Sequence, residues 1–293
     1  MIKPIIDQLF ADSPDETLYH YTSFRGLMGI VRSGVIWASD IRYMNDAAEL
    51  RHTVDMVRDE VSRRIHNGHP HAAALNAFAD WVRHRITNGH MQFAASFRAN
   101  GNLLSQWRGY SAPGKGVSIG VAPDWLETCV RRQGWRIGRC VYDSALQQQL
   151  VRQVINQLES WLDTQPYHEG GAHLAREQAW QQMLTEMETD LLMLATVLKH
   201  PSFQEEGEWR VVSPSITDFI QADVKFREGT SMLVPYVELE LQSAPDEPLR
   251  LDHLYLGPTP NRLISMNSLT MFLTSHGIRP ARGVSYCQIP YRH

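Results

Sequence analysis

Two glutamates stand two residues apart at the start of an apolar run, and this spacing most constrains how the chain can fold. The segment from Phe203 to Val212 reads FQEEGEWRVV, and its second half is typical of a strand. Because alternate residues of a strand point to one face, Glu206 and Glu208 are expected to face one cleft. Like charges held that close repel each other, and a protein keeps such a pair only where something offsets the cost. A site that stabilises a sugar cation while activating a nucleophile is one such place.

Two structural explanations of the same residues stay open. An exposed acidic loop that leads into a strand would place both carboxylates in water. Arg210 follows Glu208 by two residues, so it is expected on the same side of the strand, where it can hold the acid ionised as an ion-pair partner. If that is the whole role of Glu208, the pair is scaffolding and not a catalytic site.

A second motif lies near the N-terminus, where the chain reads LYHYTS from Leu18. The pattern predicts a strand with a His-Tyr-Thr tail, a helix that ends at Gly34, and a second strand over residues 35–38. The ring of His20 offers a donor and an acceptor beside the hydroxyls of Tyr21 and Thr22. One histidine in a strand is more often structural, and it is the coincidence with a distant E-x-E that suggests a site.

The remaining pattern alternates between helices and strands. Asn45 or Asp46 is expected to cap a helix that ends at Asn67-Gly68. Helices are predicted over residues 145–162, 174–199 and 263–274, and strands over residues 91–97, 116–121, 233–241, 251–256 and 284–289. We expect residues 1–293 to form a single α+β domain with a helical insertion at about residues 145–200.

The composition is that of an ordinary globular protein, with 293 residues, 43% hydrophobic residues and a net charge of −4. No stretch is apolar enough to span a membrane, and the N-terminus is a poor signal peptide. Three cysteines without a CxxC pair favour a reducing cytoplasm. The acidic balance argues against a broad surface that coats nucleic acid, though not against a local basic cleft. We therefore predict a soluble cytoplasmic protein without a membrane partner, and its oligomeric state stays open.

Other motifs are weaker. His66, His69 and His71 lie within six residues, but no carboxylate or thiolate follows at ligand spacing, and a surface loop between two helices explains them as well. The chain contains no Walker A, no GxGxxG and no GxSxG motif. We expect no metal site.

Taken in order, several blocks resemble a family of bacterial proteins that carry a domain of unknown function. The blocks are LYHYTS, IRYMND..EL, F..SF, LSQWRGY, GKGVSIG, FQEEGEWRVV, VPYVEL and LGPTPN..IS, and they run from about Leu18 to Arg292. That family is distantly similar to ADP-ribosyltransferases. The HYT start resembles that of diphtheria-toxin-like enzymes and of toxins that modify DNA, whereas the E-G-E resembles the branch that modifies arginine. The resemblance implies an ADP-ribosyltransferase-like split β-sandwich with helices on its flanks and a helical insertion.

The resemblance also implies site residues, with NAD as the substrate. Glu208 would stabilise the ribose cation that forms when nicotinamide leaves, and Glu206 would orient or deprotonate the acceptor. His20 would bind the adenosine-side ribose, and Ser96 would support the catalytic glutamate. The other residues assigned to NAD binding are Tyr21, Thr22, Asn45, Trp107 and Arg108, with Tyr43, Arg42 and Arg98 as further candidates for stacking or for the pyrophosphate. For Trp107 and Arg108, a loop anchored by a buried indole is an equally good explanation.

The expected activity is therefore transfer of ADP-ribose from NAD to a nucleic-acid base or a protein side chain. By analogy with the family, the setting would be that of a toxin or an anti-phage effector. Two alternatives stay open: a non-catalytic module that binds a nucleotide or a protein on the same scaffold, and an NAD glycohydrolase that uses water as acceptor.

Overall fold

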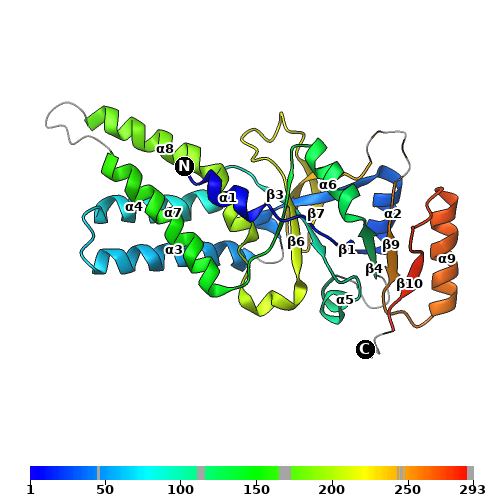
Figure 1. Cartoon of the computed structure of the whole chain (residues 1–293). Coiled ribbons are helices and arrows are strands. Elements are labelled where there is room, and N and C mark those ends of the chain that lie inside the picture. The colour runs from blue at the N-terminus through cyan, green and yellow to red at the C-terminus, as the bar shows by residue number, and fades with distance from the viewer. Residues whose placement is uncertain are drawn as a thin grey trace.

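The structure is a computed structural model, and it describes residues 1–44, 47–110, 116–164, 173–242, 244, 247 and 249–288. Asn45, expected to cap a helix and to contact NAD, lies outside the described residues. The fold class is mixed α+β, as predicted: an open, mostly antiparallel sheet has helices at both ends (Figure 1).

The described sheet contains ten strands, in the order β10-β9-β4-β1-β3-β2-β8-β7, with β6 on β3 and β5 on β6. Strand pairings are antiparallel except that of β9 with β10. The strands are β1 (Leu18–Ser23), β2 (Val35–Asp40), β3 (Phe93–Arg98), β4 (Gly116–Val121), β5 (Arg136–Arg139), β6 (Glu208–Val212), β7 (Lys225–Glu228), β8 (Leu233–Glu240), β9 (His253–Leu256) and β10 (Val284–Tyr286). The sequence patterns did not predict β5 or β7, because four residues are too few to show an alternation.

One edge of β3 is divided between two strands. Along its other edge β3 pairs with β6 from Ala94 to Arg98. On the divided edge β1 pairs with β3 only at Arg98, whereas β2 pairs only at Phe93 and Ala94. The strands β1 and β2 therefore separate beside Ser96, and we call this opening in the sheet the split.

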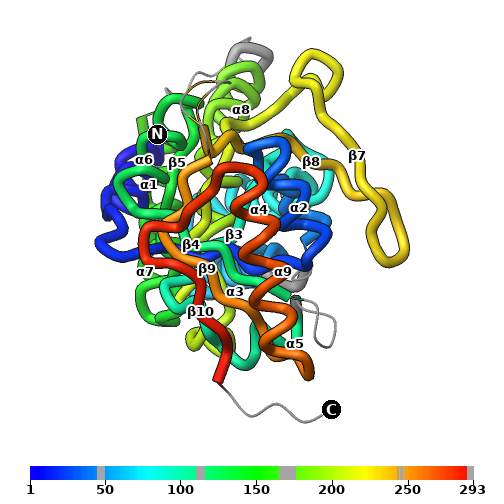
Figure 2. Tube along the Cα trace, turned by 90° about the vertical axis from the view of Figure 1, so that its right-hand side faces the viewer, coloured from blue at the N-terminus to red at the C-terminus, as the bar shows by residue number. Residues whose placement is uncertain are grey.

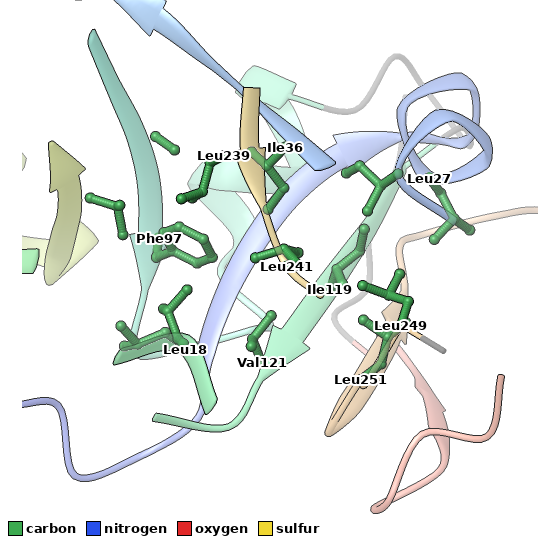
Figure 3. Close-up of a cluster of buried hydrophobic side chains, with 14 of the residues drawn as sticks. Leu18, Leu27, Ile36, Phe97, Ile119, Val121, Leu239, Leu241, Leu249 and Leu251 are labelled. Atoms are coloured by element: carbon green, nitrogen blue, oxygen red, sulfur yellow. The ribbon is translucent and has the colours of Figure 1, made fainter. Parts of the chain in front are cut away.

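The larger hydrophobic core lies against one face of the sheet (Figure 3). Phe97 of β3, Ile119 of β4 and Leu239 of β8 are fully buried in this core. Helix α2 (Phe24–Ser33) covers part of it through Leu27, Ile30 and Val31. Its N-cap, Ser23, accepts a hydrogen bond from the Gly26 amide at 3.1 Å, and Gly34 ends it with a φ of 71°, as the sequence predicted.

A second core belongs to a lobe of four helices on one side of the sheet (Figure 1). The helices are α3 (Ala47–His66), α4 (Ala72–Asn88), α7 (Ser144–Thr164) and α8 (His173–Val197). Helix α3 packs against α4, α7 and α8. The helices expected as an insertion, α7 and α8, thus share their core with an earlier segment of the chain. The short helix α1 (Lys3–Leu9), which the sequence patterns did not predict, buries Ile2 and Ile6 in this core.

The remaining helices cover the sheet and its connections. They are α5 (Leu104–Tyr110), α6 (Pro123–Arg132) and α9 (Arg262–Ser275), with two 3₁₀ turns, η1 (Ile41–Tyr43) and η2 (Pro201–Glu206). Among the described helices, none is both long enough and apolar enough to cross a membrane. Cys129, Cys140 and Cys287 are buried.

We predict that Ile119→Ala lowers the free energy of unfolding by about 2–5 kcal/mol, because it leaves a cavity in the larger core. Ile264 of α9 is 72% exposed, so Ile264→Ala should change the same quantity by less than about 0.5 kcal/mol. Urea denaturation of the two variants measures both values. Equal losses would contradict the assignment of this core.

Candidate functional site

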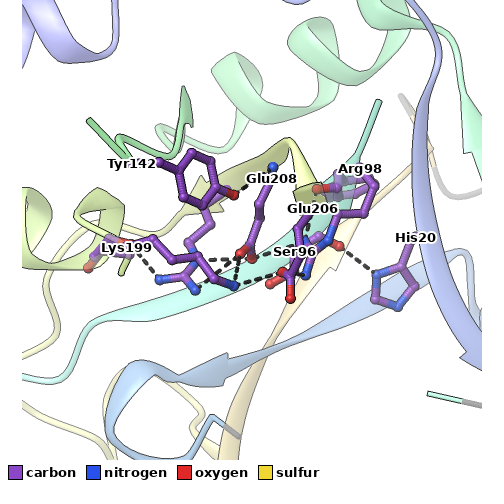
Figure 4. A network of polar contacts seen from close by, with 10 residues as sticks. His20, Ser96, Arg98, Tyr142, Lys199, Glu206 and Glu208 are labelled. Atoms are coloured by element: carbon purple, nitrogen blue, oxygen red, sulfur yellow. Dashed lines mark hydrogen bonds and ion pairs between the residues drawn. The ribbon is translucent and has the colours of Figure 1, made fainter. Parts of the chain in front are cut away.

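Strand β3 lies between the two motifs that the sequence singled out. Strand β1, which carries His20, runs along one edge, and β6, which begins at Glu208, runs along the other (Figure 4). Arg98 pairs in register with Tyr19 on one side and with Glu208 on the other. The His-Tyr-Thr motif and the E-x-E motif are therefore one strand apart.

Glu208 is fully buried, and three cations surround its carboxylate. The Lys199 Nζ lies 2.6 Å from Oε2, the Arg98 Nη1 lies 3.1 Å from Oε1, and the Arg210 Nε donates to Oε1 at 3.0 Å. Burial alone would raise the pKa of Glu208, but the charges of Arg210, Arg98 and Lys199 outweigh it and hold the pKa well below its usual value. Glu208 is therefore ionised at neutral pH.

Glu206 shares two of these cations. Its Oε2 lies 2.6 Å from the Arg98 Nη2 and 2.8 Å from the Lys199 Nζ, and 13% of its side chain is exposed. Arg98 and Lys199 thus bridge the two carboxylates, which offsets the repulsion between them. Glu206 is the member of the pair that solvent reaches.

The geometry of the pair differs from the prediction of two acids on one strand. Glu206 ends the turn η2, Gly207 follows with a φ of 49°, and β6 begins only at Glu208. The two carboxylates meet because both bind Arg98 and Lys199, and not because they alternate along a strand. Gly207 takes up the left-handed conformation that joins the turn to the strand.

The ion pairs are anchored to the end of helix α8. The Arg210 Nη1 donates to the carbonyl of Thr196 at 2.6 Å, and the Lys199 amide donates to the carbonyl of Val141 at 3.0 Å. The amide of Glu208 donates to the Tyr142 hydroxyl at 3.0 Å. The expected pairing of Arg210 with Glu208 on one face of β6 is confirmed.

Lys199 and Tyr142 are the participants that sequence reasoning missed. The sequence pattern predicts Lys199 only as the last residue of an apolar helix. A lysine directly after the apolar run LLMLATVL is unusual, because buried lysines require a partner, and this was the one available signal. Nothing local marks Tyr142, which reaches the site through the tertiary fold.

His20 lies at the split. Its Nδ1 donates to the main-chain carbonyl of Ser96 at 3.0 Å, at the point where β1 and β2 have left the edge of β3 (Figure 4). The carbonyl can only accept, so Nδ1 carries the proton and Nε2 is the acceptor nitrogen. Burial lowers the pKa of His20, the bond to Ser96 opposes this, and the charge of Arg98 lowers it further. His20 is therefore neutral at pH 7.

Tyr21 and Trp107, two of the residues expected to contact NAD, pack against each other. Their rings meet edge to face at 4.8 Å, and both side chains are buried. The Tyr21 hydroxyl donates to the carbonyl of Asn100 and accepts from the amide of Leu103, both at 2.8 Å. The Trp107 Nε1 donates to the Asn102 Oδ1 at 2.9 Å. Trp107 is therefore the buried indole that anchors a loop, as the structural explanation of this residue predicts.

The other candidates are spread around this region. Thr22 is half-buried and lies over Gly26, whereas Arg108 is exposed at the end of α5. Ser96 contributes its main chain to His20 and stands opposite Arg210. Arg42 binds Asp40 through Nε at 2.9 Å, and the Tyr43 ring is 40% exposed.

The histidine-rich turn contacts two carboxylates of α7. The His69 Nε2 lies 3.0 Å from Glu159, and the His71 Nε2 lies 2.8 Å from Asp163. Sequence spacing had not indicated these carboxylates. Within the described ranges, no group of three or more histidines, cysteines or acids is arranged to hold a metal ion.

A family model described as "Protein of unknown function (DUF2971)" matches residues 106–211, from α5 through β6. The match includes Lys199 and both glutamates, and it supports the predicted similarity to a family with a domain of unknown function. No curated protein and no solved structure matches the chain.

We predict that Glu208→Gln lowers the free energy of unfolding by about 3–5 kcal/mol, because it leaves buried cations without their carboxylate. Glu205→Gln, an exposed change three residues earlier, is the matched control and should be near neutral. Urea denaturation measures both. Adding Lys199→Met to Glu208→Gln should recover part of the lost unfolding free energy, because the lysine left without its carboxylate is removed. If the effects of the two single substitutions simply add, Lys199 and Glu208 do not stabilise each other.

The lowered pKa of Glu208 also predicts a pH dependence. Glu208 is harder to protonate in the folded chain, so the stability that it contributes is complete above its unfolded pKa, about 4.3. That contribution is lost as the pH falls below this value toward the folded pKa. The difference in unfolding free energy between the wild type and Glu208→Gln should therefore shrink from about pH 5 downward. A difference that does not change between pH 7 and the lowest pH at which both chains fold would contradict this assignment.

Proposed function

We propose that this chain is an ADP-ribosyltransferase-like protein that binds NAD beside the split and breaks its nicotinamide–ribose bond. The observation that supports the proposal most is the position of Arg98. Its side chain binds both glutamates of the E-x-E motif, and its charge also lowers the pKa of His20 on the opposite edge of β3. Two motifs that lie far apart in the sequence thus share one cation.

In the proposed reaction, the bond between the ribose C1′ and the nicotinamide nitrogen breaks, and its electron pair leaves with nicotinamide. The positive charge that develops on the ribose is stabilised by an ionised carboxylate. The surrounding cations keep Glu208 in that state at neutral pH. Glu206, which solvent reaches, accepts the proton of the attacking nucleophile.

The cations also set a requirement for this reaction. Because Arg98 and Lys199 bind the glutamate carboxylates, NAD has to draw at least one of them away before Glu208 can reach the ribose. The pyrophosphate is the part of NAD that competes for a guanidinium or an ammonium group. On this proposal, His20 offers its Nε2 to a ribose hydroxyl.

The full burial of Glu208 favours a second candidate, a non-catalytic module that binds a nucleotide or a protein. A carboxylate that serves only to join β3, β6 and α8 would show the same contacts. In that case Glu208→Gln changes stability alone.

We predict that the protein releases nicotinamide from NAD and that Glu206→Gln lowers this turnover by about 10²-fold or more, because the nucleophile loses its base. Glu208 still holds Arg98 and Lys199 in this variant, so it should lose less stability than Glu208→Gln, and Glu205→Gln should keep full turnover. Labelled NAD incubated with DNA, RNA, cell lysate or buffer alone separates transfer from hydrolysis.

The same experiment decides between the two candidates. A wild-type chain that binds but does not consume NAD, or that ignores NAD, supports the binding module. Expression in a bacterial host tests the expected setting of a toxin or anti-phage effector: growth arrest that Glu206→Gln relieves supports it, and normal growth with the wild type contradicts it.

A further inference from the structure

A stacked aromatic pair with one exposed member lies on β2 and β8. The Trp37 ring stacks on the Tyr236 ring, with centroids 4.5 Å apart and planes 29° from parallel. Tyr236 is buried, but half of Trp37 is exposed. Stacking on Tyr236 holds the Trp37 side chain in place, while part of its indole stays open to solvent. The exposed part can stack on a second planar group.

A partly buried arginine lies on the same face. Arg227 of β7 points to the side that carries Tyr236, since Arg227 pairs with Val234, two residues away on β8. Its Nη2 donates to the Ser39 Oγ at 3.0 Å, and within the described part of the chain no carboxylate forms an ion pair with it. Burial lowers the pKa of Arg227, yet a guanidinium stays charged. An anion placed here would offset the lost solvation.

The acidic neighbour of this pair forms an ion pair with a lysine. Glu238 stands opposite Trp37 on β8, and its Oε2 lies 2.8 Å from the Lys225 Nζ. Lys225 also lies 3.6 Å from Asp223, which is largely exposed. The carboxylate opposite Trp37 is therefore held by Lys225 and not by Arg227, which stays available to an anion.

The β2 member of this pair, Trp37, lies at the rim of the split. Ser39 pairs with Ala94, so continuing the same register would place Trp37 opposite Ser96. The strands have separated by that point, and the carbonyl of Ser96 binds His20 instead. His20 thus lies on the β1 side of the split and Trp37 on the β2 side. The segment that contains β7 projects from the body of the molecule (Figure 2).

We propose that Trp37, Tyr236, Arg227 and Ser39, together the Trp37 surface, bind single-stranded nucleic acid. An unpaired base stacks on Trp37 and its phosphate binds Arg227. A duplex keeps its bases stacked inside, so it cannot use the platform. The site is local, which agrees with a chain whose net charge is −4. This inference rests on the proposed function, and it makes single-stranded nucleic acid the acceptor of ADP-ribose.

Fluorescence anisotropy of an end-labelled single-stranded oligonucleotide, without NAD, tests the binding. Trp37→Ala should raise the Kd about tenfold, as loss of one stacked base does. Phe219→Ala, at a residue 52% exposed, is the matched aromatic control and should leave the Kd unchanged. Arg227→Gln should reduce the slope of log Kd against log salt by about 0.7, whereas Arg131→Gln on α6 should not.

Binding of a duplex as tightly as the single strand, no binding of either, or a Kd that Trp37→Ala leaves unchanged in a folded variant would each overturn the inference. Nicotinamide release measured on the same samples keeps the two proposals apart. Oligonucleotide binding without NAD consumption would reject the proposed function and keep the Trp37 surface. NAD consumption without oligonucleotide binding would keep the proposed function and reject the Trp37 surface.

Discussion

The buried carboxylate of Glu208 binds cations from two paired strands and from the end of a helix. Arg98 comes from β3, Arg210 from β6, and Lys199 from the residues that follow α8. Each cation would be costly to bury alone, and so would the acid. Because every partner depends on the others, the end of helix α8 is held against β3 and β6.

The split in the sheet follows from a related constraint. Strands β1 and β2 both use one edge of β3, and each can occupy only part of it. A main-chain carbonyl left in the opening requires a donor, and the His20 ring supplies it. A ring at this position carries its proton on the nitrogen that faces the strand, and its second nitrogen is the one that can accept. The Nδ1 of His20 therefore has a structural role, and its Nε2 is the atom that the proposed chemistry uses.

Local patterns predicted much of the fold because their signals are complete within a few residues. The helix between Ser23 and Gly34 has its cap, its apolar face and its glycine stop within one segment. The four-residue strands β5 and β7 offered no such signal and are defined by their neighbours. The spacing of Glu206 and Glu208 suggested that they were close, but it assigned Glu206 to a strand when it ends a turn. Spacing alone does not distinguish a strand from a turn that contains glycine.

By itself, the sequence determined the α+β class, the positions of most elements and the two motifs, since these depend on periodicity, caps and residue chemistry. Only the tertiary structure decided that Lys199 and Arg98 bridge the glutamates, that Tyr21 and Trp107 pack on each other, and that Trp37 lies across the split from His20. Burial and pairing are properties of neighbours in space: Arg210 is two residues from Glu208 in the chain, but Arg98 and Lys199 come from other elements. The charge state of a buried side chain therefore depends on neighbours that the local sequence does not reveal.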